Sequence, residues 1–91
     1  MEILPDMIPC AKKGYMLQEM DGEMLLYSPA EVTTTYMNPS AVLIWKFCDG
    51  RHSVQTIVDD LTEYFPDALG LSQDVISTLE DFYTRKLVEF R

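Results

Sequence analysis

Short runs rich in apolar residues, broken by turn residues, fill the first third of the chain, which therefore looks like β structure. Two short runs, Tyr15–Met20 and Glu23–Tyr27, flank Asp21-Gly22, a dipeptide that tolerates the positive φ angles of a two-residue hairpin turn. The turn predicts that these runs pair as antiparallel strands, with Leu17 opposite Leu26.

A third strand is predicted after a short break in this pattern. Ser28-Pro29-Ala30 ends the second run, and the following segment Glu31–Met37 is rich in β-branched and aromatic residues. Its threonines suit an edge or half-exposed position.

From residue 38 onward the apolar residues recur at helical spacing. Asn38 is a good N-cap, Pro39 suits the first helical position, and Gly50 is expected to supply the left-handed residue that ends the helix. Apolar residues lie on nearly every side of this helix, so it must be surrounded by other elements. They are Ala41, Val42, Leu43, Ile44, Trp45, Phe47 and Cys48.

Two amphipathic helices are predicted next. Ser53 caps the first, whose apolar stripe runs until Pro66, and Ser72 caps the second. The closing Leu87–Phe90 is expected to be a short extended segment docked on the body. The stripes are Val54, Ile57, Val58, Leu61, Tyr64 and Phe65 in the one helix, and Val75, Ile76, Leu79, Phe82 and Tyr83 in the other.

This order of elements predicts an α+β fold of the winged helix-turn-helix type, with an N-terminal three-stranded antiparallel sheet followed by three helices. With 91 residues and 47% hydrophobic content, the chain has the size of one small domain with a single core. We expect residues 14–91 to form this domain and residues 1–13 to be a flexible N-terminal segment.

Charge and cysteine content narrow the function classes. Seven basic against fifteen acidic residues give a net charge of −8, which disfavours nucleic acid and anionic lipid as partners. Two cysteines do not make a disulfide framework, and we find neither a secretion signal nor a run of 18 apolar residues. These features favour a cytoplasmic protein.

A set of helix and turn residues, in a fixed order, points to a family. These residues are Met37-Asn38-Pro39-Ser40-Ala41, Ile44-Trp45, Cys48-Asp49-Gly50, Ser53-Val54, Ile57-Val58, Leu61, Asp74-Val75, Leu79 and Leu87-Val88. Over about Tyr15 to Phe90 they closely resemble the pattern of the PqqD family. This family contains the small protein of pyrroloquinoline-quinone biosynthesis and related recognition elements for ribosomally made, post-translationally modified peptides. Many members have Gly where this chain has Lys86, so we expect the exit of the last helix to be placed differently.

The resemblance implies a non-catalytic module that binds the leader part of a precursor peptide and presents it to a modifying enzyme, often a radical S-adenosylmethionine protein. In such modules the leader adds as a further strand beside the third strand, against the third helix. Carried onto this chain, the implied binding residues are Glu31, Val32, Thr33, Thr34, Thr35, Tyr36, Asp74, Ser77, Thr78, Asp81, Phe82 and Arg85. It implies no cofactor, and an open strand edge also leaves homodimer formation possible.

Other functions have weaker support in the sequence. A winged-helix DNA-binding regulator would need basic or amide side chains on the third helix, which instead carries Asp74, Glu80 and Asp81. A metal site at His52 and Cys48 would lack third and fourth ligands. We find no nucleophile with an evident base, so no catalytic residue is expected.

Overall fold

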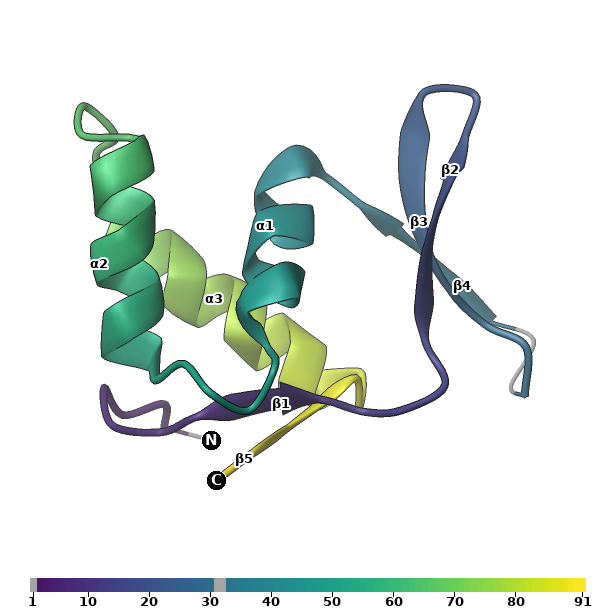
Figure 1. The fold of residues 1–91 in the computed structure, drawn as a ribbon, viewed down its shortest axis with the longest axis horizontal. Helices are drawn as coiled ribbons and strands as arrows, with labels where there is room; N and C mark the ends of the chain where they lie inside the picture. The colour runs from purple at the N-terminus through teal and green to yellow at the C-terminus, as the bar shows by residue number, and fades with distance from the viewer. Residues whose placement is uncertain (1, 31–32) are drawn as a thin grey trace.

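The three-stranded sheet stands to one side of the three helices, and a second, two-stranded sheet passes beneath them (Figure 1). The computed structural model describes residues 2–30 and 33–91. In chain order the elements are β1 (Pro9–Ala11), β2 (Met16–Met20), β3 (Glu23–Ser28), β4 (Thr33–Met37), α1 (Pro39–Phe47), α2 (Val54–Tyr64), α3 (Leu71–Thr84) and β5 (Val88–Phe90). The predicted α+β, winged-helix-like architecture is confirmed. Glu31 and Val32, predicted to begin the third strand, lie outside the described residues.

The β2–β3 hairpin forms at the predicted turn. Asp21 and Gly22 have φ angles of 53° and 80°, as a two-residue turn with the right-handed twist of the strands requires. The register places Leu17 opposite Leu26, as expected, and β4 then pairs antiparallel with the other side of β3.

Helix α1 begins as predicted but ends earlier. The Asn38 side chain accepts a hydrogen bond from the Ala41 N–H at 2.8 Å, and Pro39 occupies the first turn. The helix ends at Phe47 with Cys48 as its C-cap, whereas Gly50 takes its positive φ of 78° in the turn that follows. Gly50 therefore redirects the chain after the helix.

Helices α2 and α3 differ in how well their starts were predicted. Ser53 caps α2 and accepts from the Thr56 N–H at 3.1 Å. The prediction that Ser72 caps α3 is wrong. Gly70, with a φ of 69°, precedes the helix without a side-chain cap, and Ser72 lies inside the first turn. A glycine at this bend lets the chain enter the helix from a left-handed conformation.

The exit of α3 is a Schellman motif built on Lys86. The Lys86 N–H donates to the Tyr83 carbonyl at 3.0 Å, and the Leu87 N–H donates to the Phe82 carbonyl at 2.8 Å. Lys86 has a φ of 62°, so a lysine takes the left-handed conformation that favours glycine. Leu87 and Phe82 are both buried, which holds the motif in place.

One core joins the sheet to the helices. Trp45 of α1 makes edge-to-face contacts with Tyr15 and with Phe82 of α3, at ring centroid distances of 6.2 and 5.6 Å. Ile57, Val75 and Leu79 are fully buried around them. These contacts connect α1 to α3 and to the residue before β2, and so fix where the sheet stands beside the helices.

Segments near the two ends of the chain form the second sheet, which the sequence pattern did not predict. Pro9 pairs with Phe90 and Ala11 with Val88 in the β1–β5 ladder. Ile3 is buried in the core. The segment 1–13, expected to be flexible, thus contributes a strand and a core residue, and the closing segment is extended and docked as expected.

Candidate functional site

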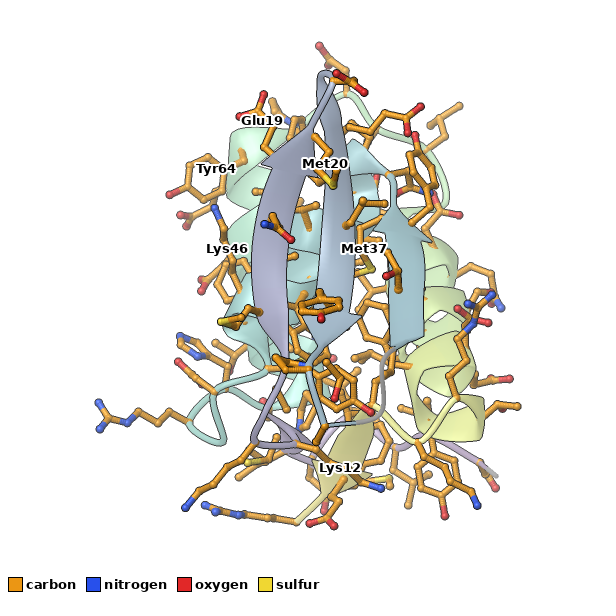
Figure 2. All side chains as sticks on the ribbon, turned by 90° about the vertical axis from the view of Figure 1, so that its right-hand side faces the viewer. Lys12, Glu19, Met20, Met37, Lys46 and Tyr64 are labelled. Atoms are coloured by element: carbon orange, nitrogen blue, oxygen red, sulfur yellow. The ribbon has the colours of Figure 1, made fainter. Side chains whose placement is uncertain are left out.

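Strand β4 is an edge strand beside helix α3. The order of the sheet is β2-β3-β4, so within the described residues one side of β4 has no strand partner. Figure 2 shows the sheet face on, with β4 along the side that lies next to α3. An edge strand presents backbone N–H and C=O groups to any extended chain.

The register determines which backbone groups of β4 face outward. The two-residue turn closes β2 and β3 at the pair Met20 and Glu23, which is therefore a hydrogen-bonded pair. Bonded and non-bonded pairs alternate along each antiparallel ladder. Carried through β3, this alternation directs the backbone of Thr35 toward β3 and the backbone of Thr34 and Tyr36 toward the free edge.

A groove of about 310 Å³ separates this edge from α3. We call it the β4–α3 groove. It is lined by Thr35, Tyr36, Met37, Asn38, Ala41, Ser77, Thr78, Asp81, Phe82 and Arg85. Its apolar floor comes from Met37, Ala41 and Phe82, which are at most 9% exposed.

Polar side chains form the α3 wall of the groove. Arg85 Nε donates to the Asp81 carboxylate at 3.1 Å, one helical turn away, and both side chains are about half exposed. The remaining guanidinium donors of Arg85 can bind an acceptor on a guest chain. Ser77 and Thr78 add hydroxyls further along the same wall. The groove thus offers both a surface for an apolar side chain and polar contacts at its rim.

The structure brings most of the residues expected at the site into one place. Thr35, Tyr36, Ser77, Thr78, Asp81, Phe82 and Arg85 all line the β4–α3 groove. Thr33 and Thr34 belong to β4, and Asp74 lines a neighbouring groove instead. Glu31 and Val32 lie outside the described residues.

Three lining residues were missed by the sequence analysis. Met37 was predicted in the third strand, Asn38 at the helix cap and Ala41 in the buried helix, yet all three line the groove where β4 meets α1. A helix cap and a core position give no sign of a ligand, because the same residues would be expected there without one.

Cys48 and His52 are held by local hydrogen bonds. Burial, with Asp49 and Cys10 nearby, raises the pKa of the Cys48 thiol to about 12, and its Sγ donates to the Ile44 carbonyl at 3.2 Å. A protonated thiol is a weak nucleophile. Slight burial opposes ionisation of Asp49, but hydrogen bonds from His52 and the Arg51 N–H outweigh it and lower the pKa of this carboxyl.

Two further observations concern metal sites and membrane-spanning helices. Within residues 2–30 and 33–91, no three His, Cys, Asp or Glu side chains are grouped to hold a metal ion. In the same part of the chain, none of the helices has the length and apolar character needed to cross a membrane.

Comparison with known proteins gives consistent matches. Residues 23–88 match the family model described as coenzyme PQQ synthesis protein D (PqqD). A PqqA binding protein of Rahnella aquatilis is 30% identical over 86 residues, covering 91% of this chain and 87% of the relative. A PqqA binding protein of Acinetobacter baylyi is 34% identical over 83 residues, covering 88% and 81%.

A solved structure shares the fold. The structure of TbiB1 in complex with the TbiA(beta) leader peptide aligns with a TM-score of 0.70 and 16% identity, covering 88% of this chain and 94% of that one. At this identity the match establishes a common fold.

Proposed function

Because this chain belongs to the PqqD family, we propose that it is an adaptor that binds the leader part of a PqqA-type precursor peptide as an added strand beside β4. The observation that carries the proposal is the free edge of β4 next to the β4–α3 groove. Relatives named for binding PqqA support it, as does a leader peptide in the structure of a protein with the same fold.

Backbone and side chains have separate tasks in this proposal. The outward N–H and C=O groups of Thr34 and Tyr36 supply pairing that is independent of sequence, and the groove selects among side chains of the guest. The proposed binding residues are Glu31, Val32, Thr33, Thr34, Thr35 and Tyr36 on the strand and Ser77, Thr78, Asp81, Phe82 and Arg85 on the helix, with Asp74 beyond the end of the groove.

The adaptor presents the bound peptide to a modifying enzyme, such as a radical S-adenosylmethionine protein, and is not itself catalytic. The raised pKa of the Cys48 thiol supports this division of labour, since the buried cysteine is protonated at neutral pH. A DNA-binding function is not favoured. The exposed face of α3 carries Asp74, Glu80 and Asp81, which phosphates repel.

Proline substitutions on the two edge strands test the proposal. Thr34→Pro removes an outward N–H of β4, which an edge strand tolerates because no ladder bond is lost. We expect binding of synthetic PqqA of Rahnella aquatilis to weaken at least tenfold, from the lost hydrogen bond and the bulk of the ring at the pairing edge. Isothermal titration calorimetry measures the affinity, and circular dichroism checks the fold.

Glu19→Pro is the matched control. By the same alternation it removes an outward N–H from β2, at the opposite edge of the sheet. This variant should bind the peptide like the unmodified protein. Equal affinities for both proline variants, or no binding of PqqA by the unmodified protein, would refute strand addition at β4.

A further inference from the structure

A second groove lies between the three helices, beyond the end of the β4–α3 groove. It has a volume of about 330 Å³, and we call it the helical groove. It is lined by Pro39, Ser40, Leu43, Ile44, Leu61, Phe65, Ala68, Leu71, Asp74 and Val75. Leu43 and Phe65 are 37% and 46% exposed, so large apolar side chains of this groove remain in contact with water.

The two grooves are neighbours on the same two helices. At the start of α1, the cap residue Asn38 and Ala41 line the β4–α3 groove, while Pro39 and Ser40 line the helical groove. On α3, the lining changes in the same way, from Ser77 in the one groove to Asp74 in the other. Asn38, Pro39, Ser40, Asp74 and Ser77 are all exposed, so the surface between the grooves is open to solvent.

The dimensions fit one extended peptide. The α3 wall of the β4–α3 groove, from Ser77 to Arg85, is about 12 Å long at 1.5 Å per residue. The five residues of β4 span about 13 Å from the first Cα to the last at 3.3 to 3.4 Å per residue, so a strand paired along β4 has the length of this wall. Its next two or three residues, at the end nearest Met37, reach the helical groove.

We propose that the helical groove binds apolar side chains of the precursor peptide segment that directly flanks the strand-added part. This inference rests on the proposed function and extends its site by a second anchoring point. Continuity with the β4–α3 groove favours the peptide as the occupant. A second copy of this chain is disfavoured, because each copy carries a net charge of −8.

The test compares two substitutions in the helical groove with one outside both grooves. Leu43→Gln and Phe65→Gln replace exposed apolar side chains and should each weaken binding of full-length PqqA of Rahnella aquatilis about tenfold. Met20→Gln is the matched control. Met20 is 53% exposed and belongs to β2, which stands apart from the helices (Figure 1), so this variant should bind normally.

Shortened peptides separate this inference from the proposed function. We expect removal of the flanking segment from one end of PqqA to lower affinity for the unmodified protein, and to make Leu43→Gln and Phe65→Gln bind as tightly as that protein. Thr34→Pro should still weaken binding of the shortened peptide. The end at which truncation has this effect also reveals whether the added strand runs parallel or antiparallel to β4.

Methyl NMR signals give a readout that does not depend on the variants. Full-length PqqA should shift the signals of Leu43 and Leu71, and the shortened peptide should leave them in place. If the variants and the methyl signals do not respond while Thr34→Pro still impairs binding, the helical groove is not a peptide site and strand addition stands. If Thr34→Pro also has no effect, the proposed function itself fails.

Discussion

The C-terminal end of α3 tests whether backbone strain affects the stability of this domain, because Lys86 takes a left-handed conformation that suits glycine. A left-handed conformation costs an L-residue about 1 to 2 kcal/mol, and glycine avoids this cost. Glycine loses about 0.5 to 1 kcal/mol through the greater freedom of the unfolded chain. We therefore expect Lys86→Gly to raise the free energy of unfolding by about 0.5 to 1 kcal/mol, as measured by urea denaturation at neutral pH.

In a domain of this size, the same change raises Tm by roughly 2 to 8 °C. Lys86→Ala separates the backbone effect from the loss of the charge, because alanine retains the left-handed strain and should leave stability nearly unchanged. Lys46→Gly is the matched control. Lys46 lies in the last turn of α1, where the same replacement should lower stability by about 1 kcal/mol. Stabilities of Lys86→Gly and Lys86→Ala that agree within error would show that strain at this helix end has no energetic role.

Four further outcomes follow from particular contacts. Asn38→Ala removes the cap of α1 and should lower the free energy of unfolding, measured by urea denaturation, by about 1 kcal/mol. A change below about 0.3 kcal/mol would contradict a stabilising role for this cap. Phe82→Ala leaves a cavity beside Trp45 and should lower the free energy of unfolding by about 3 to 5 kcal/mol. Because this is a large share of the stability of a small domain, tryptophan fluorescence should no longer show a cooperative unfolding transition. The pKa of Asp49 is lowered in the folded state, so Asp49 contributes stability that is present above about pH 4 and is lost as the pH falls through its lowered pKa. Asp49→Asn should therefore make the free energy of unfolding less dependent on pH at the acid end of a pH titration. At pH 8 a thiol reagent should modify one cysteine in the native protein and two in urea, and rapid modification of Cys48 without unfolding would contradict its burial.

Local signals in the sequence predicted much of the fold. The turn at Asp21-Gly22 and the caps at Asn38 and Ser53 each depend on residues within four positions of one another, so their geometry follows from the chain itself. The exception is the start of α3. There Gly70 and Ser72 both suit a helix start, and the helix begins at Leu71, directly after Gly70.

The β1–β5 sheet could not be predicted from local pattern. Its strands have three residues each and come from opposite ends of the chain. Strands of three residues are too short to show a clear alternation of apolar and polar residues. Their pairing depends on the tertiary structure, which brings the two ends of the chain together.

The candidate site shows the same difference between local sequence signals and tertiary structure. The sequence by itself determined an edge strand rich in threonine, a polar face on α3 and, by family resemblance, a peptide as the ligand. Only the tertiary structure decided that Met37, Asn38 and Ala41 line the groove, that Asp74 belongs to the next groove, and that Thr34 and Tyr36 turn their backbone groups outward. Side-chain periodicity along a strand is visible in its residues, but the direction of its free N–H groups is set by the partner strand with which it pairs.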